Sequence, residues 1–180
     1  MNTLPLNEPA GVLVKTTGVD FPGRIAGSFF LRGCNLRCPY CYNTDLVIKT
    51  TAQNQNTETS QSKLNTIQEL FDHLEKRQGI LSGLVISGGE PLLNPYTPLI
   101  IKKAKELDYK VKLDTNGNNP DIIHSLLDKS LIDYVAMDIK NSKEHYRLSV
   151  GTSLFDLEKL DESIHLIMNS NIDYEFRTTV

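Results

Sequence analysis

The segment Gly33-Cys34-Asn35-Leu36-Arg37-Cys38-Pro39-Tyr40-Cys41-Tyr42-Asn43 contains all three cysteines of this 180-residue chain. Their Cys-x3-Cys-x2-Cys spacing supplies three soft thiolates within one short loop. Cysteine is the usual ligand of iron–sulfur clusters, and three cysteines leave one iron of a four-iron cubane exposed. Pro39 would break a continuous helix, which favours a loop around the metal centre, with Leu36 and Tyr40 shielding it from water.

Two other interpretations of the cysteines remain open. Structural zinc normally takes four protein ligands, so a fourth donor would have to come from a histidine. None of the four histidines lies in a Cys/His spacing pattern: His73, His124, His145 and His165. A disulfide is disfavoured because the odd number of thiols crowds one loop and no secretory segment is visible. We therefore expect an open iron–sulfur site, with zinc or an inert thiol cluster as the alternatives.

The composition indicates one soluble domain over residues 1–180, with 39% hydrophobic and 23% charged residues. A net charge of −3 does not suggest a nucleic-acid partner. Residues 1–5 lack a basic segment followed by an apolar stretch, and no run approaches the roughly 18 apolar residues of a membrane span. We expect no membrane partner and a reducing, cytoplasmic setting.

Apolar runs of strand length alternate with amphipathic segments, which is typical of βα units that form a parallel sheet. We predict an α/β fold with five parallel strands, at about 24–31, 83–87, 110–115, 134–139 and 172–180. Helices are predicted at about 64–74, 99–107, 121–131 and 155–168. The polar segment 49–63 is predicted to be a flexible loop within one crossover, because it has nothing to bury.

Polar clusters follow each of the first four predicted strands: the cysteine loop, Ser87-Gly88-Gly89-Glu90-Pro91, Asp114-Thr115-Asn116-Gly117 and Asp138-Ile139-Lys140. Functional residues of such sheets gather at the carboxyl ends of strands, so the four clusters should meet at one rim. Taken alone, each later cluster is weak. A Gly-Gly-x-Pro stretch is most often a turn. A lone aspartate is as often a helix cap or turn residue as a functional group.

The cysteine spacing, with Tyr40 just before the last cysteine, resembles the signature of the radical S-adenosylmethionine enzymes. Gly88, Gly89, Glu90 and Pro91 match their Gly-Gly-Glu-Pro stretch residue by residue. The resemblance implies a partial (βα) barrel in which backbone and acid groups of this stretch meet the ammonium of S-adenosylmethionine.

In that superfamily the three cysteines hold a [4Fe–4S] cluster, and the resemblance assigns this catalytic role to Cys34, Cys38 and Cys41. It implies that S-adenosylmethionine chelates the exposed iron. The reduced cluster then cleaves this cosubstrate to a 5′-deoxyadenosyl radical. No side chain is needed as a conventional acid or base.

The clusters after the third and fourth strands resemble the glycyl-radical activating enzymes in particular. By this resemblance Asp114, Thr115 and Asp138 hold a monovalent cation. Lys140 contacts the carboxylate of the cosubstrate, and Arg177 in the last strand is a further cosubstrate contact.

Residues 15–26, Lys-Thr-Thr-Gly-Val-Asp-Phe-Pro-Gly-Arg-Ile-Ala, resemble the opening of the anaerobic ribonucleoside-triphosphate reductase activating proteins. The resemblance implies hydrogen-atom abstraction from a glycine of such a partner enzyme, with a flavodoxin or ferredoxin type electron donor. Tyr42 and the segment 49–63 would then lie where the partner's loop inserts. The alternatives are a radical enzyme acting on a small molecule or peptide, similar to 7-carboxy-7-deazaguanine synthase, or a non-catalytic metal-binding remnant.

Two features depart from this family pattern. Members commonly carry histidine directly after the third cysteine, where this chain has Tyr42, so any proton or ligand contact made there would change. Six βα units are usual, whereas this sequence stops within the fifth strand. We expect either a truncated chain or a partner that completes the barrel, because an uncovered strand edge tends to pair.

Overall fold

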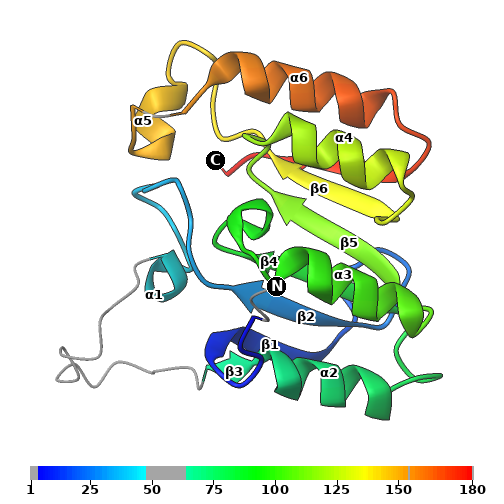
Figure 1. The fold of residues 1–180 in the computed structure, drawn as a ribbon. Coiled ribbons are helices and arrows are strands. Elements are labelled where there is room, and N and C mark those ends of the chain that lie inside the picture. Colours follow the sequence, from blue (N-terminus) through cyan, green and yellow to red (C-terminus); the bar gives the residue numbers. More distant parts are fainter. Residues whose placement is uncertain (1–3, 48–63, 154, 180) are drawn as a thin grey trace, which may run out of the picture.

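A computed structural model describes residues 4–47, 64–153 and 155–179, and the predicted loop at 49–63 lies outside them. These residues form a seven-stranded sheet (Figure 1). Its order is β3 (Asn65–Thr66), β1 (Pro9–Thr17), β2 (Ala26–Leu31), β4 (Gly83–Gly88), β5 (Lys110–Thr115), β6 (Tyr134–Asp138) and β7 (Asp173–Arg177). From β2 to β7 all neighbours are parallel, whereas β1 runs antiparallel to both β2 and β3.

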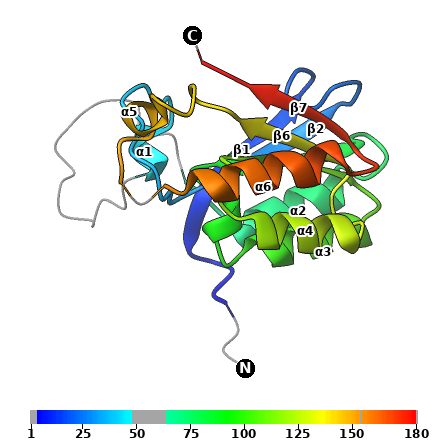
Figure 2. The same cartoon turned by 90° about the horizontal axis from the view of Figure 1, so that it is seen from above.

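Four amphipathic helices cover one face of the sheet, as Figures 1 and 2 show: α2 (Ile67–Lys76), α3 (Thr97–Glu106), α4 (Pro120–Asp128) and α6 (Leu157–Met168). Three short helical elements follow the carboxyl ends of strands: α1 (Thr44–Val47), η1 (Pro91–Leu93) and α5 (Tyr146–Val150). None of the helices in the described part of the chain is long and apolar enough to cross a membrane.

The five predicted parallel strands and the α/β fold are confirmed, with shifts at their ends. β2 begins at Ala26 because Phe21 and Arg24 form a turn, in which the Arg24 amide donates to the Phe21 carbonyl over 3.1 Å. α2 begins after Thr66, whose hydroxyl and the Glu69 carboxylate form a capping box. α4 ends at Asp128 rather than at 131, because Ser130 adopts a left-handed conformation with φ 52°.

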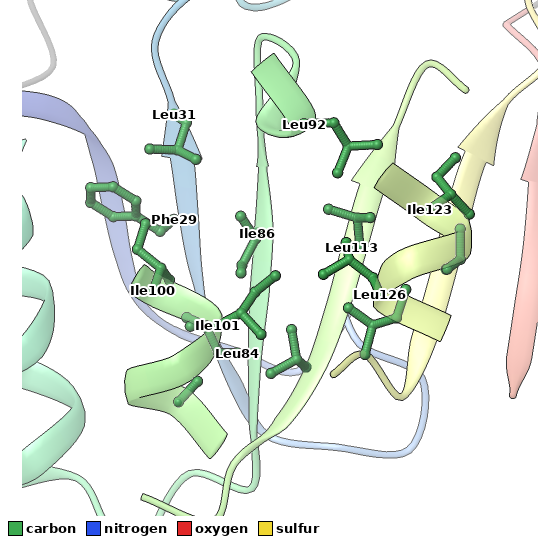
Figure 3. Packing of buried hydrophobic residues seen from close by; sticks show 14 of the residues in the cluster. Phe29, Leu31, Leu84, Ile86, Leu92, Ile100, Ile101, Leu113, Ile123 and Leu126 are labelled. Atoms are coloured by element: carbon green, nitrogen blue, oxygen red, sulfur yellow. The ribbon is translucent and has the colours of Figure 1, made fainter. Parts of the chain in front are cut away.

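The sheet has two chemically different faces because side chains alternate along each strand. The face under the helices is the apolar core, where the large side chains are fully buried (Figure 3): Phe29, Leu31, Leu84, Ile86, Leu113, Ile100, Ile101 and Ile123. The alternate residues on the other face include Ser28, Lys112, Asp114, Glu175 and Arg177. That second face is therefore mainly polar, with a small apolar cluster of Phe21, Ala26, Val85 and Tyr134, and it leads to the carboxyl ends of the strands.

Candidate active site

A cavity of about 540 Å³ lies at the carboxyl ends of the parallel strands, over the polar face. Its lining brings together most of the predicted site residues: Cys34, Cys38, Tyr40, Cys41, Gly88, Gly89, Asp114, Thr115, Asp138, Lys140 and Arg177. Glu90 and Pro91 are buried behind this lining and do not belong to it. The predicted rim therefore exists, and two of its predicted members support it from behind.

The cysteine loop is held in place by backbone hydrogen bonds to two surrounding helices. The Gly33 amide donates to the Leu46 carbonyl in α1 over 2.7 Å, and the Arg37 amide donates to the Val150 carbonyl in α5 over 2.8 Å. At the C-terminus of α5, Gly151 has φ +64°, and a Cβ there would lie 2.0 Å from the Arg37 carbonyl oxygen. α1 and α5 therefore flank the loop, as Figures 1 and 2 show.

Contacts within the loop orient its first cysteine. The Leu36 amide donates to the Cys34 sulfur over 3.3 Å, and the Asn116 amide group donates to the Asn35 side-chain oxygen over 2.8 Å. Leu36 is only 2% exposed and packs into the core. These bonds tie the loop to the end of β5, so the position of Cys34 depends on a strand far along the chain.

The cysteine thiols lie in a partly buried environment and influence one another. Burial raises the pKa of Cys34, and Glu90, Cys38 and Cys41 raise it further by charge repulsion, against a bond from the Leu36 amide. Burial also raises the pKa of Cys38, while the Lys140 ammonium opposes the rise. Three thiols that repel as thiolates are stabilised by a positively charged metal centre, because metal binding requires the thiolate form.

Gly88 and Gly89 allow the loop after β4 to pack closely against β2 and the cysteine loop. Gly88 has φ +118°, and a Cβ there would lie 2.3 Å from the backbone of Leu31. A Cβ on Gly89 would lie 2.0 Å from the Gly33 carbonyl oxygen. The Cβ positions of both glycines face β2 and the start of the cysteine loop, so backbone packing requires glycine at both.

Glu90 ties the loop after β4 to the end of β5. Its carboxylate accepts from the Thr115 hydroxyl over 2.9 Å, the Asn116 amide over 2.8 Å and the Leu92 amide over 3.1 Å. Burial raises the pKa of Glu90 to about 7 despite these donors. The resemblance assigns an acid group of this stretch to the ligand's ammonium, but the structure places this one against protein donors, 1% exposed.

Two aspartates face each other across the end of the sheet with a guanidinium between them. Arg177 Nε donates to Asp138 Oδ1 over 3.1 Å, and its terminal nitrogen donates to Asp114 Oδ2 over 3.3 Å. Lys140 Nζ donates to Asp138 Oδ2 over 3.0 Å, and the Ser87 hydroxyl donates to Asp114 Oδ2 over 3.0 Å. All five groups come from the ends of neighbouring strands or directly after them, which explains why residues so distant in sequence meet here.

Burial and neighbouring charges shift the pKa values of these groups in opposing directions. Burial raises the pKa of Asp114, with Arg177 and Lys112 opposing the rise. Burial lowers the pKa of Arg177, but Asp114 and Asp138 outweigh it, so the net shift is upward. Lys140 behaves in the same way, since Asp138 overcomes the effect of burial and raises its pKa. Arg177 and Lys140 therefore both remain positively charged in the site.

Lys112 is a functional-site residue that the sequence reasoning missed. It is 3% exposed, and its ammonium donates to the Asp20 carbonyl over 2.6 Å and to the Glu175 carboxylate over 3.0 Å. Its place in Lys-Val-Lys-Leu-Asp-Thr, two residues before Asp114, is the signal that could have found it. Residues two apart in a strand share a face, so Lys112 had to point toward the cavity.

These residues fit an iron–sulfur cluster better than a closed zinc site. No three His, Cys, Asp or Glu side chains in the described part of the chain are arranged around a single metal ion. A zinc ion needs such convergence, whereas in a cubane cluster each cysteine binds a different iron. The cavity has the volume of a small-molecule site. It also places the hydroxyl of Tyr40 and Oδ1 of Asp114 without a hydrogen-bond partner, and a bound ligand could satisfy such buried atoms.

Residues 28–180 match the family described as the radical SAM superfamily, in which SAM stands for S-adenosylmethionine. The chain belongs to the radical SAM superfamily. This match begins within β2 and includes the cysteine loop and the other four parallel strands. The superfamily resemblance inferred from the motifs is therefore confirmed, and membership implies a [4Fe–4S] cluster and S-adenosylmethionine as cofactors.

Two relatives within the radical SAM superfamily are similar in sequence to this chain. It is 34% identical over 171 residues to a protein of Methanocaldococcus jannaschii named as a glycyl-radical enzyme activating enzyme, covering 93% of this chain and 66% of that one. It is 35% identical over 124 residues to the pyruvate formate-lyase-activating enzyme of Clostridium pasteurianum, covering 68% and 48%. The chain thus spans two thirds or less of these relatives.

The fold is also that of QueE from Escherichia coli. The two structures agree with a TM-score of 0.51 over 95% of this chain and 94% of that one, at 14% sequence identity. An identity this low supports the fold alone. With the parallel order of β2 to β7, it supports the predicted partial barrel.

Proposed function

We propose that this radical SAM protein reductively cleaves S-adenosylmethionine and uses the resulting radical to generate a glycyl radical on a partner enzyme. The observation that carries the proposal is the convergence of Cys34, Cys38 and Cys41 with Lys140 and Arg177 on one cavity. The two relatives named as activating enzymes support the glycyl-radical class. An anaerobic ribonucleotide reductase-like enzyme is the partner we propose.

Each side chain has a distinct part in this proposal. The cysteine thiolates hold the cluster, which when bound supplies the electron for cosubstrate cleavage. Lys140 and Arg177 provide the positive charge for the cosubstrate carboxylate, because Lys140 stays charged beside Asp138 and Arg177 stays charged between both aspartates. Leu36 and Tyr40 line the cavity beside the thiols and exclude water from them.

The partner has to reach the rim of the cavity, and one side chain there is free to meet it. Tyr42 lines the cavity and is 96% exposed, directly after the last cysteine. An exposed aromatic ring offers a large apolar contact at low entropic cost. We propose Tyr42 as a contact for the partner's glycine loop, with a flavodoxin or ferredoxin type donor and a cytoplasmic setting.

The proposed function is tested with anaerobically reconstituted protein, reduced in the presence of S-adenosylmethionine and the partner. We expect 5′-deoxyadenosine by chromatography and a glycyl radical by electron paramagnetic resonance, both lost in Cys38→Ala. Lys140→Met should weaken cosubstrate binding roughly tenfold, since a charge-assisted hydrogen bond contributes about 1.5 kcal/mol. Lys143→Met is the matched control, because Lys143 pairs with Asp161 outside the cavity.

The outcomes separate the proposed function from its alternatives. Cleavage without a glycyl radical on any partner, but with turnover of a small molecule or peptide, would overturn the activase assignment. A fully loaded cluster that never cleaves S-adenosylmethionine would overturn the enzymatic proposal altogether.

A further inference from the structure

We infer that Arg177 is a built-in cation that fills the place between Asp114 and Asp138, so that this chain needs no monovalent metal ion there. Its relevance to cosubstrate binding rests on the proposed function. The family resemblance assigns Asp114, Thr115 and Asp138 to a monovalent cation, but the arrangement of these residues does not fit such an ion.

The guanidinium bridges the two carboxylates directly. It donates to Asp138 Oδ1 over 3.1 Å and to Asp114 Oδ2 over 3.3 Å, so one side chain spans the gap. A metal ion bound by both aspartates would compete for these same oxygens. Arginine suits this position because its planar fork can donate in two directions and it remains charged.

The oxygens that remain are already next to positive charge. Asp138 Oδ2 accepts from Lys140 Nζ over 3.0 Å. Asp114 Oδ1 has no hydrogen-bond partner, but the Lys112 ammonium lies 3.8 Å from it. Two carboxylates thus face the cations of Arg177, Lys140 and Lys112. A further cation there would gain little attraction and would be repelled by its neighbours.

Thr115, the third proposed ligand, is turned toward the buried loop. Its hydroxyl donates to Glu90 Oε1 over 2.9 Å and accepts from the Gly117 amide over 3.2 Å. The side chain therefore has two protein partners already. Binding an ion through this oxygen would require that the network around Glu90 be rearranged.

Backbone pairing fixes the arginine where it is. In the parallel ladder Asp138 lies opposite Arg177, and the Ile139 amide donates to the Arg177 carbonyl over 2.8 Å. The guanidinium therefore starts from a strand position beside Asp138, and the side chain reaches across β6 to Asp114 on β5. Its placement follows from the register of β7 and does not depend on a mobile surface loop.

The first test measures whether the protein without cosubstrate binds a monovalent ion. Thermal unfolding is followed in tetramethylammonium chloride and after replacement by potassium or sodium chloride at equal ionic strength. For the natural sequence we expect the same midpoint in all three salts. For Arg177→Gln, which leaves both carboxylates without their bridging cation, we expect a rise in potassium or sodium, because an ion that binds only the folded state stabilises it.

The second test measures the dissociation constant of S-adenosylmethionine in the same salts. The natural sequence should show a change below about twofold, whereas Arg177→Gln should bind at least about fivefold more tightly with potassium or sodium, the lower end of typical coupling between sites. Lys110→Gln is the matched control, since it removes a cation paired with Asp133 at the opposite end of β5. It should behave as the natural sequence does.

Both results can overturn the inference. An ion-specific rise of the unfolding midpoint in the natural sequence would show that a cation site exists beside Arg177. If the unfolding midpoint of Arg177→Gln is the same in all three salts, Arg177 does not take the place of a monovalent ion. If the natural sequence binds no S-adenosylmethionine in any salt, the proposed function fails, and the unfolding measurements still decide this inference. Should Arg177→Gln not fold, the natural sequence alone gives the deciding midpoints.

Discussion

Glu90 shows how a residue of a ligand-binding motif can act through the protein instead. Gly88 and Gly89 before it line the cavity, but its own carboxylate is buried and accepts three hydrogen bonds from the loops around it. The sequence placed this residue at the correct rim. It could not reveal the direction of the side chain, because that depends on Thr115 and Asn116, 25 and 26 residues further along.

Glu90→Gln should change how stability depends on pH. The folded protein holds the Glu90 proton up to a pKa of about 7, above the ordinary value of 4.5. Protons therefore favour the folded state, and this contribution is lost as pH rises from 4.5 to about 7. We expect the natural sequence to lose roughly 2 to 3 kcal/mol relative to Glu90→Gln between pH 5 and 8.

Denaturant unfolding of both proteins at pH 5 and at pH 8 measures this difference. Glu106→Gln, a change at an exposed carboxylate on α3, is the matched control. A stability difference between Glu90→Gln and the natural sequence that is the same at both pH values would contradict the raised pKa.

At the scale of elements, the sequence predicted the strands and helices whose apolar residues recur at a regular spacing. It missed the elements that are defined by contacts with other segments of the chain. The parallel strands β2, β4, β5, β6 and β7 alternate with amphipathic helices. The spacing of the apolar residues was therefore sufficient to predict them. β1 was missed because six of its nine residues are partly or fully exposed, and its pairing with β2 is interrupted by a register shift. The short helix α5 has no period to detect, yet it supports the cysteine loop.

The junction between β2 and β4 gives a sharp test of how elements position the site. Gly89→Ala should destabilise the fold by about 3 kcal/mol, because the new Cβ would meet the Gly33 carbonyl oxygen and a packed backbone cannot yield cheaply. Since Gly33 precedes the first cysteine, we also expect less iron per chain after reconstitution. Unfolding midpoints and iron analysis measure the two effects.

Gly27→Ala is the control for this junction. Gly27 lies within β2, next to the same junction, but a Cβ there would be no closer than 3.7 Å to any neighbouring atom, which is ordinary contact. This variant should keep both its stability and its iron content. Equal behaviour of the two alanine variants would refute the steric explanation.

At the scale of the whole molecule, a charged network on the polar face connects the N-terminal hairpin to the last strand. The Ser28 hydroxyl donates to the Asp20 carboxylate over 2.6 Å, and Lys112 joins the Asp20 carbonyl to the Glu175 carboxylate. The Lys112 ammonium also lies 5.2 Å from the centre of the Tyr134 ring. This network was not predicted, since it consists of contacts between residues as many as 92 positions apart.

Lys112→Met should lower the free energy of unfolding by about 2 kcal/mol, because a buried carbonyl and a carboxylate lose their donor. The loss is no larger because Glu175 is about one third exposed and water can solvate its carboxylate. Adding Glu175→Gln should recover part of the loss, since the uncompensated charge is then removed. Chemical unfolding of the single and double variants measures the coupling, and purely additive effects would disprove it.

The position of Arg177 and Glu175 has a consequence for the native state. Both lie on β7, which among the described strands pairs with β6 alone and is partly exposed along its whole length. A transient opening of this one strand would carry both charges away from the cavity while the core under α2, α3 and α4 stayed packed. The protein can thus lose binding competence without unfolding, and amide hydrogen exchange in β7 would report how often it does.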